Sequence, residues 1–218
     1  MDAALPSGAT SHDFFRRARA RLTLDVPAAL DDPTVEATRG DLDLDPAMWE
    51  QAGVKATRPA AVLVPVVDRS EPTVLLTLRT ELPSHPGQIA FPGGKIEAQD
   101  RSPADAALRE AAEEIGLARA LIDPIGYLDL YLTFSGYRIL PTVARIRPDY
   151  KLALSSAEVA EAFEVPLAIL MNAQNHALHS RDWKGVTRRY YAIPFGERYI
   201  WGVTAGILRN LYERIYED

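Results

Sequence analysis

The chain has 218 residues, of which 47% are hydrophobic and 25% charged, and this composition excludes wholesale disorder. Its net charge of −6 argues against general affinity for nucleic-acid backbones, and the lack of any cysteine excludes disulfides, thiol catalysis and thiolate metal sites. Because its apolar runs are too short to cross a bilayer and its first twenty residues lack the apolar core of a signal peptide, we expect a cytoplasmic protein that binds neither nucleic acid nor a membrane.

Two segments precede the first predicted strand. Residues 11–22 begin with Ser11, a favourable N-cap, and predict a short basic amphipathic helix. Residues 23–58 are rich in Pro, Asp and Ala without a sustained hydrophobic period, which indicates an irregular lead-in. We expect residues 1–58 to pack on a main domain of residues 59–218. The sequence leaves open whether they instead pair two chains into a homodimer, or do neither.

Beyond the lead-in, runs of β-branched and aliphatic residues predict strands. The predicted strands are Ala60–Val67, Thr73–Arg79, one short apolar strand within the turn-rich Ser84–Gly94, Ile125–Leu132, Ile139–Ile146, a brief strand at Glu164–Pro166, and Arg189–Ile193. A short helix follows Pro166, and a longer helix closes the chain near Gly202–Tyr216. Because strands and helices do not alternate strictly, this order predicts an α/β fold in which helices sandwich a mixed β-sheet.

A further helix is predicted over Pro103–Ile115. Ser102 is its N-cap, Pro103 fits the first helical position, and Gly116 fits a left-handed C-cap. At 100° per residue, its predicted core face consists of Leu108, Ala111, Ala112 and Ile115.

The same helix carries three glutamates on the side opposite its core face. Glu110, Glu113 and Glu114 are immediate neighbours at the spacing i, i+3, i+4, with Arg109 beside them. Clustered carboxylate oxygens are ligands that Mg²⁺ and Mn²⁺ prefer. A solvated acidic face has the same pattern, because like charges at this spacing cost only about 0.2–0.5 kcal/mol. The helix alone therefore does not distinguish a metal site from a charged surface.

The segment upstream of the helix favours the metal site. FPGGK at residues 91–95 places a pair of glycines, whose backbone can approach a ligand closely, ahead of the acidic helix. Together they resemble the signature of the Nudix hydrolase family: glycine, five residues, glutamate, seven residues, then Arg-Glu-aliphatic-x-Glu-Glu-x-Gly-aliphatic. The matching residues are Gly94, Arg109, Glu110, Ala111, Glu113, Glu114, Gly116 and Leu117. The first half differs, because Asp100 replaces the glutamate and eight residues separate it from Arg109.

This resemblance implies a Nudix-type α/β/α sandwich with a mixed β-sheet and a pyrophosphohydrolase that needs Mg²⁺ or Mn²⁺. The implied metal ligands are Glu110, Glu113 and Glu114, and the first and last of these are favoured as direct ligands. A main-chain carbonyl of Gly93 or Gly94 would complete the metal shell.

The resemblance also implies catalytic residues. Arg109 would orient a glutamate through a charge-assisted hydrogen bond, and Glu113 would act beside it. Members of the family often take a general base from a later loop, for which Glu158 is the first candidate and Glu161 the second. Both glutamates equally fit the charged surface of a helix.

Residues 75–94 look like the second motif of one branch of the family, the coenzyme A pyrophosphatases. The matching residues are Leu75, Leu76, Thr77, Gly87, Phe91, Pro92, Gly93 and Gly94. The arginine of that motif is missing, since Pro83 and Ser84 lie in its place, and Arg79 is the substitute phosphate partner. The expected substrate-binding residues are Arg79, Gly93, Gly94 and Lys95. We expect Leu75 and Phe91 to pack in the core.

The branch implies hydrolysis of coenzyme A or its thioesters to 3′,5′-ADP and (acyl-)4′-phosphopantetheine, so the partner would be a small nucleoside diphosphate derivative. The missing arginine leaves open a Nudix hydrolase of ADP-ribose, dinucleoside polyphosphates or nucleoside triphosphates. A non-catalytic nucleotide-binding module of the same fold is a further alternative, against which the complete set of glutamates argues. An isopentenyl-diphosphate isomerase is disfavoured because the chain has no cysteine.

The segment Arg188–Leu208 also looks like the C-terminal part of this branch. Its tyrosines can line an adenine or pantetheine pocket, whereas core packing is the favoured interpretation for Trp201. The four histidines lack metal-ligand spacing, and a lone loop histidine such as His85 usually makes no substrate contact.

Overall fold

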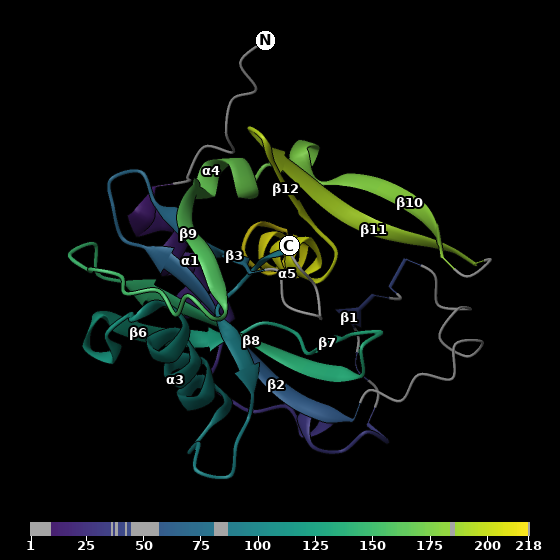
Figure 1. The fold of residues 1–218 in the computed structure, drawn as a ribbon, viewed down its shortest axis with the longest axis horizontal. Helices are drawn as coiled ribbons and strands as arrows, with labels where there is room; N and C mark the ends of the chain where they lie inside the picture. Colours follow the sequence, from purple (N-terminus) through teal and green to yellow (C-terminus); the bar gives the residue numbers. More distant parts are fainter. Residues whose placement is uncertain are drawn as a thin grey trace.

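The structure is a computed structural model that describes residues 10–35, 37, 39–41, 43–44, 57–80, 87–183 and 186–217. Within these residues nine strands form one mixed sheet: β1 (Arg39–Gly40), β2 (Arg58–Val67), β3 (Thr73–Arg79), β4 (Ile89–Ala90), β5 (Gly93–Lys95), β6 (Ile122–Tyr127), β7 (Tyr131–Leu132), β8 (Tyr137–Ile146) and β9 (Val159–Pro166). At its centre β2 runs parallel to β8, while β3 runs antiparallel to both β2 and β9 (Figure 1).

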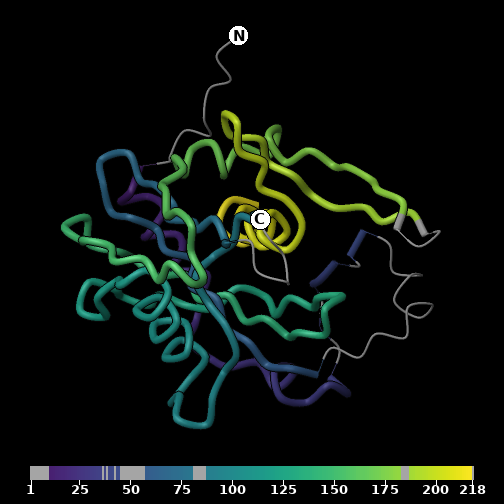
Figure 2. Tube along the Cα trace, viewed as in Figure 1, coloured from purple at the N-terminus to yellow at the C-terminus, as the bar shows by residue number. Residues whose placement is uncertain are grey.

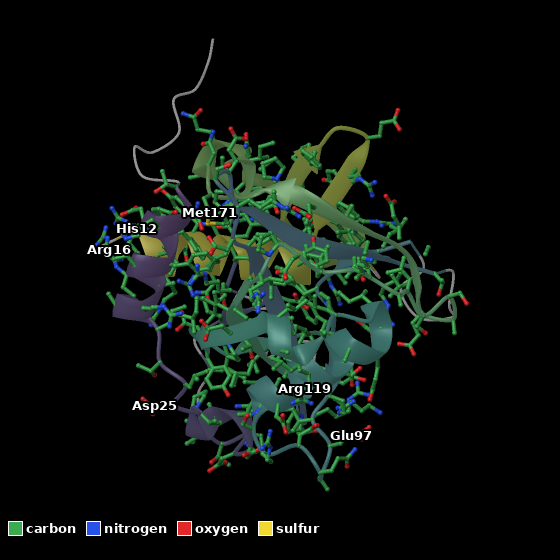
Figure 3. All side chains as sticks on the ribbon, turned by 90° about the vertical axis from the view of Figure 1, so that its left-hand side faces the viewer. His12, Arg16, Asp25, Glu97, Arg119 and Met171 are labelled. Carbon is green, nitrogen blue, oxygen red and sulfur yellow. The ribbon has the colours of Figure 1, made fainter. Side chains whose placement is uncertain are left out.

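Helices cover both faces of this sheet. The described helices are α1 (Ser11–Arg21), α3 (Pro103–Ile115), α4 (Leu167–Leu170) and α5 (Val203–Tyr216), with short 3₁₀ turns η1 (Ala28–Leu30), η2 (Arg119–Leu121) and η3 (Ala173–Asn175). Side chains alternate along β2, so that Ala61 and Leu63 pack with α3 while Val64 and Val66 pack with α1 and α5. Figure 3 shows α1, where His12 and Arg16 are labelled, beside α5. The arrangement is the predicted α/β/α sandwich with a mixed sheet.

The ends of α3 follow the sequence prediction, but its buried face does not. The Ser102 hydroxyl oxygen accepts a hydrogen bond from the Asp105 backbone N–H at 3.1 Å, and Gly116 is left-handed with φ 67°. Ala112 is exposed, so the prediction that it packs in the core is wrong, whereas Glu114 is only 4% exposed. The cause is β5, which contacts the Glu114 flank of the helix and covers it.

Several strand predictions are confirmed and others need correction. The short apolar strand within 84–94 is β4, although residues 81–86 of that turn lie outside the described residues. The predicted strand Ile125–Leu132 is two strands, because β6 pairs with the second half of β8 and β7 with its first half. Strand β9 begins at Val159 rather than Glu164, because the whole segment pairs with β3.

The helix α1 and the lead-in that follows it contribute both to the core and to the sheet. Phe14 of α1 is fully buried, and Leu30 of η1 packs with Tyr127 and Leu140. The chain then adds β1, which pairs in parallel with β7. Turn η1 contacts β8 before the chain reaches β7, and the purple and dark-blue parts of this segment can be followed in Figure 2. The domain boundary at residue 58 stays a prediction.

A second sheet with three strands packs on α5. Its strands are β10 (Ala177–Trp183), β11 (Val186–Phe195) and β12 (Arg198–Trp201), in the order β10-β11-β12. The predicted strand Arg189–Ile193 lies within β11, while β10 and β12 were not predicted. Ile193 and Ile200 bury their side chains in the cluster that contains Leu208 of α5. In the described part of the chain, every helix is too short or too polar to traverse a bilayer.

Candidate active site

Two glycines bring the backbone of β5 directly against α3. Gly93 has φ 156°, and a Cβ there would lie within 2.8 Å of two carbon atoms of Val62. A Cβ on Gly94 would lie within 2.9 Å of both carboxylate oxygens of Glu110. Glycine is therefore required for this approach. The candidate site therefore lies where β5 contacts the side of α3 that carries Glu110 and Glu114.

Glu114 is the most buried carboxylate of this site. Gly93 donates its backbone N–H to Glu114 Oε2 at 3.2 Å, and Arg79 Nη1 lies 3.8 Å from Glu114 Oε1. Burial raises the pKa of Glu114 to about 7 against the effect of these two partners, and the negative charges of Glu110 and Glu158 raise it further. Glu114 is thus held close to the glycine loop with its charge poorly compensated.

Arg109 of α3 connects the helix to residues 95–100, which follow the glycines of β5. Its Nε and Nη2 donate to the two carboxylate oxygens of Asp100, each at 3.0 Å, and Nη2 also donates to the Lys95 carbonyl oxygen at 3.0 Å. The Asp100 side chain is only 3% exposed, and the Arg109 guanidinium lowers the pKa of this carboxyl. Asp100, which departs from the family signature in the sequence, is therefore the principal partner of the signature arginine. An acidic residue separated from Gly94 by five residues was the available signal.

Two of the three signature glutamates share Arg109, and the third has other partners. Arg109 Nη1 donates to Glu110 Oε1 at 3.0 Å and to Glu113 Oε2 at 3.1 Å, whereas Glu114 faces Gly93 and Arg79. The Glu113 side chain is 59% exposed. As a result, no three histidine or acidic side chains among the described residues stand in a metal-binding arrangement.

The two candidates for the general base occupy different surroundings. Glu158 immediately precedes β9, and burial together with the charge of Glu158 raises the pKa of Glu110. Glu161 lies within β9 and forms two hydrogen bonds with Arg198, at 2.7 and 3.0 Å. Both belong to a loop and strand, so the alternative that they lie on a helix is wrong. The pairing of β9 with β3 brings Glu158 to the glutamates and directs Glu161 to Arg198.

Three of the predicted substrate-binding residues form β5, and the fourth, Arg79, lies close to Glu114. Arg79 ends β3 and reaches Glu114, and Gly93 and Gly94 form the wall of the site. Lys95 is exposed, and its carbonyl oxygen is fixed by Arg109. The structure thus brings these four residues together, and their roles in substrate binding stay predictions.

The chemistry of these groups suits a hard divalent cation. All candidate donors are oxygens, from the carboxylates of Glu110, Glu114 and Glu158 and the carbonyls of β5. Burial and mutual repulsion raise the pKa values of Glu110 and Glu114, and a cation placed between them would reverse this effect.

A cavity of about 360 Å³ lies between the lead-in and the second sheet. Its walls come from β1, β7 and the following turn, β11, β12 and the start of α5. Trp201 lines this cavity and is 37% exposed, so the interpretation of Trp201 as a core residue is wrong. Arg39 and Asp41 also line it. Neither residue was predictable from the sequence, because both come from the irregular lead-in, where no motif marks them.

Comparison with known proteins identifies the family. The NUDIX domain family model matches residues 57–185. A protein of Escherichia coli (strain K12) named "Uncharacterized Nudix hydrolase NudL" is 39% identical over 155 residues, which cover 71% of this chain and 81% of that protein. The protein of the same name from Yersinia pestis (strain Pestoides F) is 38% identical over 161 residues, covering 72% of this chain and 80% of that one. Among solved structures, DR0079 from Deinococcus radiodurans has a TM-score of 0.47 at 16% identity over 72% of this chain and 86% of that chain. Since the family model spans more than half of the chain and the relatives exceed 30% identity over most of their length, this chain belongs to the Nudix hydrolase family.

Proposed function

We propose that the protein uses Mg²⁺ or Mn²⁺ to hydrolyse the pyrophosphate bond of coenzyme A or its thioesters, releasing 3′,5′-ADP and (acyl-)4′-phosphopantetheine. Hydrolases of this family generally use divalent metal cations. The observation that carries the proposal is that Glu114 and Glu110 lie against the Gly93–Gly94 backbone, with Glu158 close enough for its charge to act on both. The substrate class rests on residues 75–94, which resemble the coenzyme A branch.

Each residue of the site has a separate role in the proposed reaction. Bound at the glutamates, the cation would neutralise charge on the phosphate oxygens. Glu158 accepts a proton from the attacking water, whose oxygen forms a bond to one phosphorus while the bond from that phosphorus to the bridging oxygen breaks. Arg109 holds Glu110, and the Gly93 N–H holds Glu114, so that the carboxylates are positioned before the substrate arrives.

Arg79 is proposed to bind a substrate phosphate in place of the arginine that the branch motif has and this chain lacks. Its guanidinium lies at Glu114 and its side chain is 28% exposed, so it is accessible beside the glutamates. A planar guanidinium can bind two phosphate oxygens at once.

A substrate panel tests the proposal. The purified protein is incubated with Mg²⁺ or Mn²⁺ and, separately, with coenzyme A, acetyl-coenzyme A, ADP-ribose, a dinucleoside tetraphosphate and ATP, and the products are resolved by chromatography. We expect coenzyme A or its thioester to give 3′,5′-ADP at the highest kcat/KM, with no product in excess EDTA. Turnover of ADP-ribose with coenzyme A untouched would overturn the substrate class. No turnover of any compound would overturn the enzymatic function and leave the binding module.

A further inference from the structure

The cavity between the lead-in and the second sheet is linked to the glycine loop through β4. Gln88 lines the cavity and stands five residues before Gly93, so their Cα atoms lie at most about 18 Å apart. The Thr204 hydroxyl donates to the Ile89 carbonyl oxygen at 2.9 Å and fixes the start of α5 to β4. A substrate whose diphosphate lies at Gly93 can therefore place one of its ends in the cavity. In Figure 1 this region lies between β11 and β12 on one side and β1 and β7 on the other.

One wall of the cavity presents aromatic rings. The ring centroids of Tyr190 and Trp201 lie 5.5 Å apart with an angle of 64° between the ring planes. Tyr190 is half-buried and Trp201 is exposed, so both rings keep accessible surface. Nucleobases stack on accessible aromatic faces of this kind, largely irrespective of which base is bound.

Arginines outnumber carboxylates on the cavity wall, although the chain as a whole has a net charge of −6. The charged lining residues are Arg39, Arg188, Arg189, Arg209, Asp41 and Asp43. Asp41 is held in place, because its oxygens accept hydrogen bonds from the Tyr131 hydroxyl at 3.0 Å and the Phe134 N–H at 2.8 Å. Arg39 and Arg209 both pair with Glu213, at 2.5 and 2.6 Å. Four arginines against two aspartates leave the lining with an excess of positive charge, part of which Glu213 neutralises.

Arg188 has the geometry of an anion-binding residue. Its Cζ lies 3.8 Å from the ring centroid of Phe134, so the guanidinium is stacked on an aromatic face. A guanidinium over an aromatic ring keeps its charge and its planar set of N–H donors. Arg188 shares one face of β11 with Tyr190, two residues further along. An anion at Arg188 and a flat ring at Tyr190 can thus belong to one ligand.

We infer that this cavity binds the nucleoside end of the substrate, with the base against Tyr190 and Trp201 and a sugar-bound phosphate at Arg188. The inference rests on the proposed function, because 3′-phosphoadenosine combines a flat base with a phosphate remote from the cleaved bond. The other end of coenzyme A, the pantetheine arm, carries no charge and does not match an arginine-rich wall.

Matched substrates test the phosphate contact. Coenzyme A and 3′-dephospho-coenzyme A differ only in the phosphate assigned to Arg188. We expect Arg188→Leu to lower kcat/KM for coenzyme A at least tenfold and to change that for the dephospho compound less than twofold. Arg188→Lys, which keeps the charge, is expected to lower the coenzyme A value selectively by at least threefold. The control is Arg181→Leu, whose position pairs with Arg188 across β10 and β11 but lies outside the cavity lining, and neither value should change.

Aromatic variants test the base contact. Tyr190→Ala and Trp201→Ala should raise KM for both substrates at least fivefold, with kcat little changed. Calorimetry provides a readout without turnover: 3′,5′-ADP should bind the wild-type protein more tightly than 5′-AMP, and Arg188→Leu should abolish the difference. Equal losses for both substrates in Arg188→Leu would overturn the phosphate assignment. Unchanged KM values in the aromatic variants, or effects that depend only on the acyl chain, would overturn the nucleoside assignment.

The two proposals fail in distinguishable ways. A wild-type protein that hydrolyses neither coenzyme A nor its dephospho form refutes the proposed function. Wild-type hydrolysis that every cavity variant retains in full refutes the cavity assignment alone. Thermal unfolding of each variant identifies a misfolded protein, and in that event Arg188→Lys and the calorimetric comparison on the wild-type chain decide the result.

Discussion

The proposed catalytic site and the cavity at Tyr190 differ in how far apart their residues lie along the chain. The glycines of β5 and the glutamates of α3 all come from residues 93–114. The cavity instead draws on residues 39–44, 131–135, 188–191 and 201–209, which meet only after β1 pairs with β7 and the second sheet packs on α5. A site made of adjacent elements leaves a motif in the sequence, whereas a site made by tertiary packing does not.

The largest expected effect comes from removing a carboxylate of the local site. Glu114→Gln should lower kcat at least about 100-fold, because it removes a charge aimed at the reacting phosphates. The fold should be unaffected, since the amide oxygen still accepts the Gly93 N–H. Steady-state kinetics and thermal unfolding measure both effects, with the exposed Glu71→Gln as the matched control. Full activity in Glu114→Gln would remove Glu114 from the proposed metal shell.

The two glycines should separate stability from activity. Gly93→Ala places a Cβ against the Val62 backbone, and we expect it to lower the free energy of unfolding by about 3 kcal/mol. In Gly94→Ala the atoms nearest to the new Cβ belong to the movable carboxylate of Glu110, so the expected loss of stability is below about 1 kcal/mol. Its kcat should nevertheless fall about tenfold, because Glu110 is displaced. Urea unfolding and kinetics measure these effects, and unaltered kcat in Gly94→Ala would show that contact with β5 has no catalytic role.

Asp100→Asn tests whether the ion pair between Arg109 of α3 and Asp100 of the preceding loop stabilises the fold. The Asp100 side chain is 3% exposed and that of Arg109 is 15% exposed, so breaking this pair should cost about 2–3 kcal/mol of unfolding free energy. The comparison variant is Glu161→Gln, which breaks the more exposed pair with Arg198 and should cost less than about 1 kcal/mol. Equal losses in the two variants would mean that the buried position of Asp100 is unimportant.

A pH-dependent loss of stability is expected at Glu164, near the opposite end of β9 from Glu158. Burial tends to raise the pKa of Glu164, but hydrogen bonds from Arg69, Thr73 and Tyr150 outweigh it and lower the pKa to about 2. Because this value lies below that of the unfolded chain, its stabilisation is present above pH 4.5 and is lost as the pH falls from 4.5 to 2.

The lost stability should be on the order of 1–2 kcal/mol after allowance for solvent screening. Chemical unfolding at pH 7, 4 and 3 should show this loss in the wild-type protein and a weaker pH dependence in Glu164→Gln. The same pH dependence in both proteins would assign the acid sensitivity to other carboxylates. Glu164 and Glu114 can be compared directly. Three hydrogen-bond donors lower the pKa of Glu164, whereas the few partners of Glu114 do not offset its burial, and its pKa is raised.

Features set by neighbouring residues were predictable from the sequence. Ser102 and Gly116 delimit α3 because caps act within one helical turn. By contrast, the helical period alone placed Ala112 inside and Glu114 outside, and only the position of β5 reverses this. The prediction for Trp201 likewise rested on the general preference of aromatic residues for the core, whereas Trp201 lines the cavity.

The contacts of Arg109 also mean that the loop between β5 and α3 becomes ordered when the chain folds, before any ligand binds. One guanidinium joins the Lys95 carbonyl, Asp100, Glu110 and Glu113, so the loop between β5 and α3, where Figure 3 labels Glu97, is fixed at both ends to the helix. The conformational entropy of this loop is therefore lost during folding and not during association with a ligand. Binding energy from the substrate then remains available for the transition state, because none of it is consumed in ordering the loop.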